Sequence, residues 1–310
     1  MSSPDPVVLC TGIAVQDLIF RVETFPPPGG KSRASAYLAV NGGCAGNAAI
    51  AVARLGGKAR YVGPLGGVQD PASEAIVMQF AREGVDASGV LRIEGAVAPV
   101  SAILVDAAGE RMIATRVEPQ LDAARLTDPA PLIDGVAAVL ADNRYGPFVL
   151  PLCRAARERG VPVVLDADRP RDAADPLFAS ASHVVFSREG LRGLVATDDL
   201  AVALREAARH SDAFLAVTDG GNDILWLRNG AVERMPVPKV DAIDTLAAGD
   251  VFHGAFALAI AEGRDAEAAL RFAAATASIK CTRFGGVAGA PGRTEVEALV
   301  SATKGSERCA

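Results

Sequence analysis

The chain has 310 residues, of which 50% are hydrophobic and 5% aromatic, and a formal net charge of −6 at pH 7. This length and apolar content are enough to bury a large core in one or two domains. The acidic balance argues against nucleic acid as a main partner, and the few aromatic side chains offer no platform on which single-stranded bases could stack.

Cysteine usage and the N-terminus both indicate a cytoplasmic protein. The five cysteines are scattered, and together with the three histidines they show no zinc-ligand spacing, so we expect free thiols in a reducing compartment. Residues 1–6 are polar and unlike a signal peptide, and no apolar run reaches membrane-spanning length, so we expect no membrane partner. The cysteines are Cys10, Cys44, Cys153, Cys281 and Cys309.

The N-terminal part of the chain contains two kinds of predicted strand. The continuous apolar run 7–15 predicts a strand buried on both faces. Shorter, more polar runs at 18–22 and 34–40 predict strands of a small exposed sheet, which a hairpin of 100–106 and 111–116 could complete. Because this sheet would draw on two separated segments, we expect a lid inserted into one domain of residues 1–310. The lid segments are about 17–41 and 98–117; a strand is also predicted at 59–63, and helices up to residue 55 and at 71–83.

From residue 136 onward, strands and helices alternate regularly. Alternation of this kind predicts an α/β fold in which a mostly parallel sheet is covered by helices on both faces, with ligands bound at the carboxyl ends of the strands. The predicted strands are 136–141, 161–166, 183–186 and 214–218, with a hairpin at 224–235; the helices are 148–159, 200–210, 249–262, 265–281 and 294–303.

The segment Asp-Thr-Leu-Ala-Ala-Gly-Asp at 244–250 leads into a helix of small apolar residues. Residues Ala247, Ala248 and Gly249 would then expose backbone N–H groups at a helix N-terminus, where the helix dipole attracts anions and small side chains let a phosphate approach. A carboxylate at Asp250 would repel phosphate, so its place beside an anion-binding turn needs a reason. The removal of a proton from a hydroxyl that attacks the phosphate is such a reason. The alternative is an ordinary first-turn acid or helix cap, and the segment alone does not decide between the two.

A second glycine-containing turn opens another alanine-rich helix. Gly42 and Gly43 permit close backbone approach to a ligand, and Asn47 on the first helical turn offers a donor and an acceptor. Asp17, just past the first strand, could accept hydrogen bonds from two hydroxyl groups, which suits a sugar. Alternatively, the two glycines only form a turn, and Asp17 is a solvated carboxylate in a loop.

These segments resemble the two signatures of the ribokinase/phosphofructokinase-B family of carbohydrate kinases. The resemblance rests on Gly12…Asp17, Gly42-Gly43…Asn47 and Asp244-Thr-x-Ala-Ala-Gly-Asp250, in the order of that family, and the α/β pattern between them covers nearly the whole chain. It implies a ribokinase-like three-layer fold, transfer of the γ-phosphoryl group from magnesium-bound ATP to a sugar hydroxyl, and a homodimer built through the lids. It also implies that Asp250 is the general base, beside an anion hole formed by the turn 247–250.

The resemblance extends to the nucleotide side. Thr218-Asp219-Gly220-Gly221 is similar to the family's phosphate loop, although Asp223 replaces its last glycine. Ser187-x-x-Gly190 replaces the family's Asn-x-x-Glu, which is tied to magnesium, so Glu189 and Asp166 are alternatives for that role. Ser278, Thr282 and Gly285 lie in a helix and loop that resemble the adenine-flanking segments, or in a helix that is simply packed; Asp244 resembles a monovalent-cation (K⁺) site, or caps a turn.

Arg144 follows a core strand at the place where ribokinase-like sequences carry a ribose-binding carboxylate. An arginine there implies an anionic group on the substrate, because a guanidinium can bind such a group in bidentate fashion. Lys31 and Arg116 of the lid could converge on the same group, or all three could be surface cations. Several motifs resemble the branch that phosphorylates 6-deoxy-6-sulfofructose, but Thr115-Arg116 departs from it.

Several functions therefore remain open at this point. The anionic acceptors are a sulfosugar, a sugar acid or a sugar phosphate. The neutral acceptors are ribose, fructose or a nucleoside such as adenosine. A sugar-binding protein without turnover is the alternative outside the enzymes; Ser187-x-x-Gly190 and Asp223 favour it, and the intact Ala-Ala-Gly-Asp turn argues against it.

Overall fold

The computed structural model describes residues 5–169, 172 and 174–307. Its centre is an eight-stranded sheet with the order β14-β13-β12-β11-β10-β9-β1-β4. The strands from β12 to β4 run parallel, and β13 and β14 add an antiparallel edge. The strands are β1 (Val7–Thr11), β4 (Lys58–Val62), β9 (Val136–Asp142), β10 (Val163–Ala167), β11 (His183–Ser187), β12 (Phe214–Thr218), β13 (Ile224–Arg228) and β14 (Ala231–Met235).

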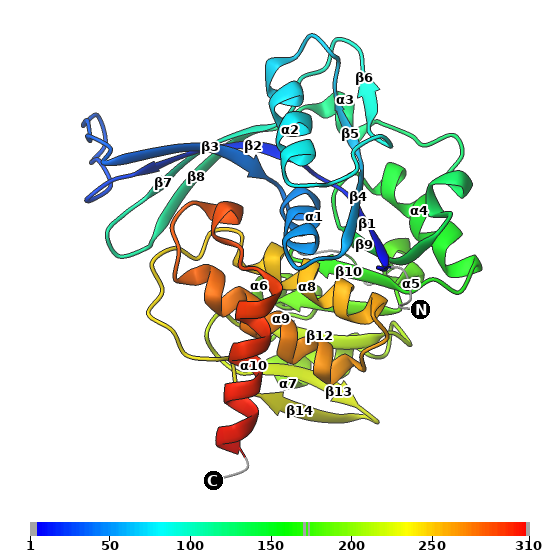
Figure 1. Ribbon diagram of the computed structural model, residues 1–310. Helices are drawn as coiled ribbons and strands as arrows, with labels where there is room; N and C mark the ends of the chain where they lie inside the picture. The colour runs from blue at the N-terminus through cyan, green and yellow to red at the C-terminus, as the bar shows by residue number, and fades with distance from the viewer. Residues whose placement is uncertain (1–4, 170–171, 173, 308–310) are drawn as a thin grey trace.

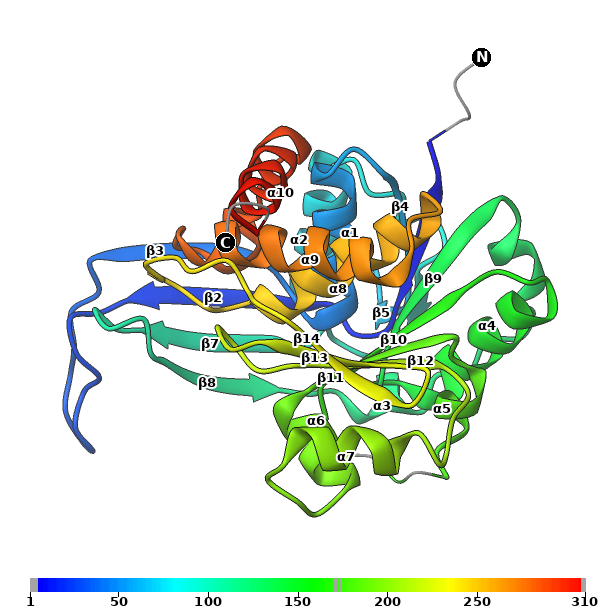
Figure 2. The ribbon, with the colours of Figure 1, turned by 90° about the horizontal axis from the view of Figure 1, so that it is seen from below.

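Helices cover both faces of this sheet, which gives three layers (Figure 2). Successive residues of β1 face opposite sides: Val8 and Cys10 belong to the core under α1, α8 and α9, whereas Leu9 belongs to the core under α4 and α7. The helices on the first face are α1 (Cys44–Arg54), α2 (Pro71–Arg82), α8 (Ala248–Ala261), α9 (Ala266–Cys281) and α10 (Arg293–Glu307). Those on the other are α4 (Gly146–Glu158), α5 (Pro176–Ser180), α6 (Arg188–Leu194) and α7 (Leu200–Ala207).

A separate four-stranded sheet, here called the lid, projects from the side of the main body (Figure 1). Its order is β3-β2-β7-β8, with β2 (Val15–Arg21), β3 (Ala36–Gly42), β7 (Val100–Val105) and β8 (Arg111–Arg116). The buried lid residues Ile19, Val40 and Ile103 share a small core with Leu246. Since Leu246 lies in the segment that leads to Asp250, the lid packs directly beside the predicted anion-binding turn.

The apolar run 7–15 does not form one strand, contrary to prediction. The chain leaves the main sheet at Gly12, whose φ is 140°, and enters the lid at Val15. A Cβ atom at Gly12 would lie 2.1 Å from the carboxyl carbon of Asp142. The break therefore depends on a glycine and on a partner 130 residues away, neither of which shows in the hydrophobic pattern.

The predicted fold class is confirmed: a large, mostly parallel sheet with helices on both faces and a small separate sheet. The structure also contains short elements that the sequence does not predict: β5 (Pro64–Gly66), β6 (Leu91–Ile93), α3 (Pro119–Asp122), η1 (Ala130–Ile133) and η2 (Gly286–Gly289). No helix within the described part of the chain is long and apolar enough to cross a membrane. Cys10, Cys44, Cys153 and Cys281 are free thiols, whereas Cys309 lies outside the described residues.

Candidate active site

The carboxyl edge of the main sheet carries a row of acids. Asp142 ends β9, and Asp166 stands opposite it in the register of β10. Helices α1 and α8 both begin near this edge, as expected where ligands bind in parallel α/β sheets. The two helices pack closely, because a Cβ atom at Gly254 of α8 would lie only 2.6 Å from the carbonyl oxygen of Ala48 in α1.

Asp250 occupies the first turn of α8, where the sequence places it. The helix begins after Ala247, which is left-handed at φ 62°, a conformation rare for a residue with a side chain. The half-buried Asp250 carboxylate accepts a hydrogen bond from Asn47 Nδ2 at 2.7 Å. The close packing of α1 on α8 thus joins residues from the two motifs, although they are 203 positions apart.

Asn47 also has a polar side-chain atom without a hydrogen-bond partner. Its Oδ1 is buried and has no hydrogen-bond partner in the structure. A buried acceptor left unpaired costs free energy unless a ligand supplies a donor. A sugar hydroxyl is such a donor.

Asp17 lies on β2 and is also buried. Its carboxyl group covers Gly42 of β3, where a Cβ atom would lie 2.1 Å from Asp17 Oδ2. Burial raises the pKa of Asp17 to about 7; a hydrogen bond from Ser101 opposes this shift, and the charge of Asp250 adds to it. The effect of the Asp250 charge on Asp17 is consistent with the two carboxylates facing the same region.

Gly43 provides the left-handed turn from β3 into α1. Its φ is 80°, and a Cβ atom there would lie 2.6 Å from the carbonyl oxygen of Ile13. The position therefore admits glycine and little else. Gly43 shapes the turn, and Gly42 leaves room for the Asp17 carboxyl group.

Arg144 points into the same region but is already paired. Its Nη1 and Nη2 bind the two carboxylate oxygens of Asp168, the second at 2.7 Å, and Nη1 also donates to Asn143 Oδ1 at 3.0 Å. Its side chain is only 11% exposed, and its Nε has no partner. Sequence reasoning missed Asp168; the hint was an acid two residues after Asp166 at the end of the same strand.

Asp142 is the other acid beside Arg144. Its carboxylate binds backbone N–H groups and not the guanidinium group of Arg144. Its carboxylate accepts N–H groups from Ile13 at 2.8 Å, Ala45 at 3.2 Å and Arg144 at 2.9 Å. Burial raises the pKa of Asp142 to about 6, and the nearby positive charge of Arg144 opposes that shift. Asp142 therefore ties together the start of α1, the break after β1 and the end of β9.

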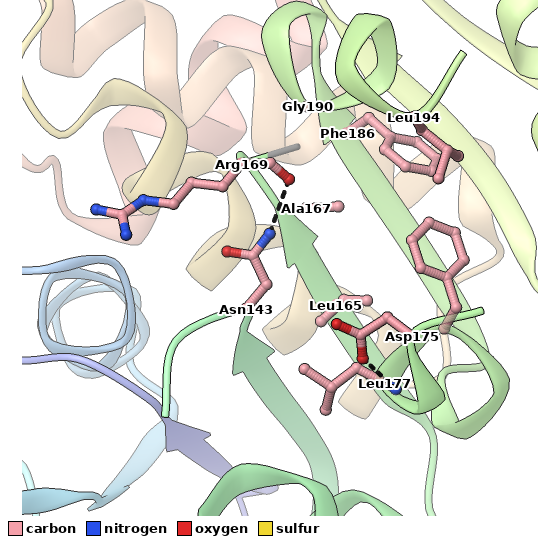
Figure 3. Close-up of a pocket in the computed structure, with 10 residues that line it drawn as sticks. Asn143, Leu165, Ala167, Arg169, Asp175, Leu177, Phe186, Gly190 and Leu194 are labelled. Carbon is pink, nitrogen blue, oxygen red and sulfur yellow. Dashed lines mark hydrogen bonds between the residues drawn. The ribbon is translucent and has the colours of Figure 1, made fainter. Parts of the chain in front are cut away.

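Asn143 joins this edge to the segment after β10. Its Nδ2 donates to the carbonyl oxygen of Arg169 at 3.0 Å (Figure 3). The void beside it, lined mainly by apolar side chains such as Leu165 and Phe186, measures about 10 Å³, roughly the space of one water molecule. It is a packing gap and not a ligand cavity.

The structure does not bring the other two predicted cations to Arg144. Lys31 is exposed in the loop between β2 and β3. Arg116, at the end of β8, is largely exposed and ion-pairs with Glu118 at 2.8 Å. Neither side chain contacts Arg144 in the described part of the chain.

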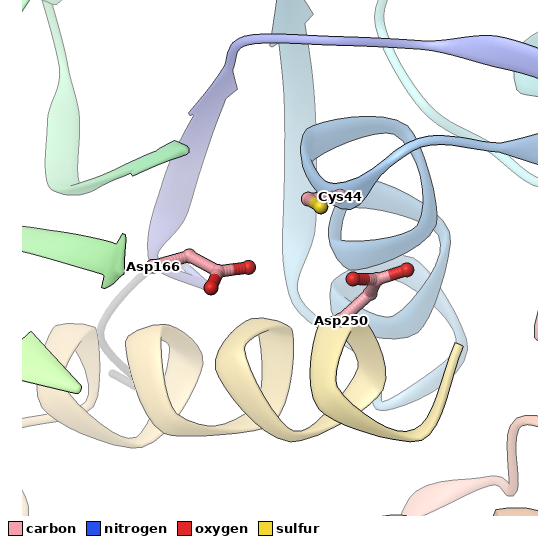
Figure 4. A group of neighbouring side chains, drawn as sticks. All are labelled: Cys44, Asp166 and Asp250. Atoms are coloured by element: carbon pink, nitrogen blue, oxygen red, sulfur yellow. The ribbon is translucent and has the colours of Figure 1, made fainter. Parts of the chain in front are cut away.

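Three potential ligand groups lie together between α1, β10 and α8 (Figure 4). Atoms of Cys44, Asp166 and Asp250 all lie within 4.8 Å of one another. Asp166 is buried with an unpartnered Oδ1, and burial raises its pKa well above the usual range, helped by the charges of Asp168 and Asp250. Two carboxylates suit a hard cation such as Mg²⁺, whereas the Cys44 thiol does not.

The predicted nucleotide residues begin at the next two strand ends. Ser187 and Thr218 are directly opposite in the register of β11 and β12. Ser187 Oγ also caps α6, accepting the N–H of Gly190 at 3.0 Å. A Cβ atom at Gly190 would lie 2.0 Å from the carbonyl oxygen of Ala167, so the glutamate expected of the family at this position would not fit here.

Two of the remaining nucleotide residues, Gly221 and Ser278, are linked through the segment 238–239. Lys239 Nζ donates to the carbonyl oxygen of Gly221 at 2.5 Å, and Ser278 Oγ donates to that of Pro238 at 3.0 Å. These bonds connect the Gly220–Gly221 loop to α9. A cavity of about 390 Å³ adjoins the loop. Its lining mixes four carboxylates with the cations Arg188, Arg234 and Lys239, and Arg188 ion-pairs with Asp219 at 2.7 Å, so the cavity is not a strongly basic phosphate pocket.

Asp244 and Gly285 meet behind the anion-binding turn. The buried Asp244 carboxylate accepts the N–H groups of Leu246 and Gly285, both at 2.8 Å, and of Gly286 at 3.0 Å. Thr282, at the end of α9, donates its hydroxyl to the carbonyl oxygen of Ile279 at 2.7 Å.

Comparison with known proteins shows the family of this chain. A family model described as pfkB family carbohydrate kinase matches residues 6–293. Ribokinase of Bacillus subtilis strain 168 is 27% identical over 94% of this chain and 98% of its own length. The crystal structure of a candidate ribokinase from Agrobacterium tumefaciens is 36% identical with a TM-score of 0.91, over 96% of this chain and 98% of that one.

A fructokinase from Xylella fastidiosa, solved with bound ATP, is 27% identical with a TM-score of 0.78, over 96% of this chain and 99% of that one. The relatives thus match the whole length of the fold and span more than one sugar specificity. The chain belongs to the pfkB family of carbohydrate kinases, as its two signatures predict, and is an ATP-dependent sugar kinase.

Proposed function

We propose that Asp250 removes the proton from a sugar hydroxyl as that oxygen attacks the γ-phosphoryl group of ATP. The observation that carries this proposal is the contact of α1 with α8, which joins Asn47 to Asp250. This contact supports the proposal because it brings a side-chain amide, a carboxylate and a helix N-terminus together. General-base and anion-stabilising groups are the two parts that phosphoryl transfer needs from a protein.

The anion hole consists of backbone groups in the first turn of α8. The N–H groups of Gly249 and Asp250 belong to a first turn, where the helix itself supplies no acceptor. The N–H of Ala248 donates to the carbonyl oxygen of Thr245 at 3.2 Å, so it fixes the turn while its neighbours face the phosphoryl group. Ala247, in its left-handed conformation, directs the chain into the helix.

The acceptor sugar binds between the lid and α1. Asp17 accepts two of its hydroxyl groups, and Asn47 Oδ1 accepts another. The nucleotide lies toward the adjacent strand ends. The residues proposed to line its side are Ser187, Thr218, Gly220, Gly221, Ser278, Thr282 and Gly285.

The residues present fit the magnesium ion that nucleotide phosphates require. Asp166, with its unpartnered Oδ1, would hold the ion, directly or through water, while the neighbouring Asp250 stays free to accept the proton. When bound, Mg²⁺ neutralises charge on the phosphates. A cation there would also lower the raised pKa of Asp166 and keep that carboxylate ionised.

A neutral sugar is the acceptor that the charges favour most. The acids Asp17, Asp142, Asp166 and Asp168 surround the site, and the charge of Arg144 is already balanced by Asp168. An anionic acceptor would enter this acidic surrounding without a free cation to receive it. Ribose and fructose are the first sugars to test.

An anionic acceptor is the second candidate, and one observation favours it. Arg144 Nε is buried without a partner, so it offers a donor to an oxygen of the substrate. A sulfonate, carboxylate or phosphate oxygen could take it and displace Asp168 from part of the guanidinium.

The test is a coupled ADP-release assay with Mg²⁺, in which ribose, fructose and nucleosides are compared with sugar acids, sugar phosphates and 6-deoxy-6-sulfofructose. We expect kcat/KM to be highest for a neutral sugar. The highest kcat/KM on an anionic sugar would establish the second candidate. If none of these acceptors supported ADP release from ATP, both candidates would be contradicted.

Arg144→Ala separates the two candidates further. If Arg144 serves mainly to hold Asp168, the variant should lose about tenfold in kcat/KM on the best neutral sugar, because it leaves a part-buried carboxylate unpaired. The double variant Arg144→Ala/Asp168→Ala should then lose less than the sum of the single changes. A loss confined to anionic sugars would instead show that the guanidinium binds the substrate.

The raised pKa of Asp17 predicts pH-dependent sugar binding. With a pKa of about 7, the carboxylate is mostly protonated at pH 6 and mostly ionised at pH 8, and the ionised form accepts more hydrogen bonds. Sugar affinity, measured by calorimetry without ATP, should therefore rise about tenfold between those pH values. Asp17→Asn should flatten the profile, and tighter binding at low pH would contradict the assignment.

We also propose that the protein forms a homodimer through its lids. Every residue of β8 is exposed, and Tyr37, Met112 and Ile113 of the lid are 54%, 51% and 46% exposed. Exposed apolar side chains on both edge strands of the lid favour association with a like surface.

A further inference from the structure

The segment before Asp250 is held from behind by a buried lysine. Lys280, near the end of α9, is 0% exposed, and fully buried lysines are rare unless they are paired. Its Nζ donates to the backbone carbonyl oxygen of Asp244 at 2.7 Å and lies 3.5 Å from the Asp244 carboxylate. Burial lowers the pKa of Lys280, and the negative charge of Asp244 opposes that shift.

The surroundings of Asp244 do not fit a soluble monovalent cation. Such an ion needs several oxygen lone pairs directed at it. Here the Asp244 carboxylate faces three backbone N–H groups and an ammonium group, and its own carbonyl oxygen accepts from the same ammonium. A second cation at this carboxylate would be repelled by Lys280.

Lys280 is connected to the reacting groups through a short path. Asp244 holds the N–H of Leu246, and the next residue, Ala247, makes the left-handed turn into α8. Asp244 also fixes the Gly285–Gly286 loop, so one carboxylate aligns the anion-binding turn with the segment after α9. A positive charge that neutralises Asp244 therefore stabilises the geometry of both.

We propose that the Lys280 ammonium group takes the place of a monovalent cation, so that this kinase needs no K⁺. Lys280 is a positioning residue, since it acts through Asp244 on the turn 245–250. The inference rests on the proposed function for its kinetic test, but the order of the turn can be measured separately through nucleotide binding.

The first experiment uses the wild-type protein and needs no variant. ADP-release rates, calorimetric ADP affinity and melting temperature are compared in choline chloride, KCl and NH₄Cl at equal ionic strength, all with Mg²⁺. We expect each rate and affinity to differ by less than about twofold between salts, because screening acts alike in all three. Several-fold activation, or tighter ADP binding specific to K⁺ or NH₄⁺, would overturn the proposal.

The second experiment removes the charge. Lys280→Ala, which also leaves space for an ion, should bind ADP and turn over about tenfold to a hundredfold less well in choline chloride, as loss of a charged hydrogen-bonding group implies. KCl or NH₄Cl should restore several-fold of that loss, and LiCl should not. The exposed residue Lys58, in the control variant Lys58→Ala, should show neither effect.

A loss in Lys280→Ala that no cation restores would reduce Lys280 to a packing role and overturn the proposal. If that variant does not fold, the wild-type salt comparison still decides. Absence of sugar phosphorylation in every salt would count against the proposed function alone, because ADP affinity continues to report on Lys280.

Discussion

Asp250→Asn is expected to lower kcat by about two to four orders of magnitude, the usual worth of a positioned general base. The change removes the proton acceptor but keeps the shape of the side chain. The amide oxygen of asparagine can still accept the hydrogen bond from Asn47 Nδ2, and the backbone of α8 is unaltered. Calorimetric ATP affinity and melting temperature should therefore stay close to the wild-type values.

A matched control tests whether Asp250 is merely a first-turn acid. Glu74 occupies the first turn of α2 and ion-pairs with Arg92 at 2.7 Å, away from the site. Glu74→Gln should leave kcat unchanged and cost at most a small amount of stability, about 0.3–1 kcal/mol. Equal kinetic effects of the two substitutions, or an Asp250→Asn enzyme within twofold of wild type, would remove Asp250 from the mechanism.

Asp250→Asn should also shift the titration of its neighbour. The negative charge of Asp250 helps to raise the pKa of Asp17, so its removal should lower that pKa. The rise of sugar affinity with pH should then occur at lower pH than in the wild type. This readout depends on charge alone and is independent of turnover.

The sequence predicts the parts of the site that are encoded locally. Asp250 and the turn before it could be placed because small residues, a glycine and an acid follow one another at a helix start. Gly42 and Asn47 could be placed for the same reason. The regular alternation after residue 136 predicts the parallel sheet, because each strand and helix carries its own hydrophobic pattern.

The parts that depend on long-range contacts could not be predicted. The pairing of Arg144 with Asp168 joins the ends of two different strands, and only their register brings the two groups together. Lys280 sits in an alanine-rich helix, where the sequence alone favours an exposed lysine, yet it is fully buried. Gly190 is explained only by the carbonyl oxygen of Ala167, which a longer side chain would strike. In each case the deciding partner is distant in sequence.

Gly42→Ala is expected to weaken sugar binding by about tenfold to a hundredfold while leaving the fold intact, as loss of a charged hydrogen-bond acceptor implies. The new Cβ atom would lie 2.1–2.4 Å from the Asp17 carboxyl atoms, so that group must leave its present position. Gly42 lacks the positive φ of Gly43, so alanine adds no backbone strain. Gly146→Ala is the control, because an added Cβ atom there meets nothing within 4 Å.

The same change in an Asp17→Ala background shows which role Gly42 has. If Gly42 only makes room for the Asp17 carboxyl group, the double variant should bind sugar no more weakly than Asp17→Ala, because the clash is gone. If the Gly42 backbone itself contacts the sugar, the alanine should cost a further several-fold. Unchanged sugar affinity in Gly42→Ala alone would contradict both roles, since the carboxyl group would then be displaced without consequence. That result would move the acceptor site away from β2 and β3.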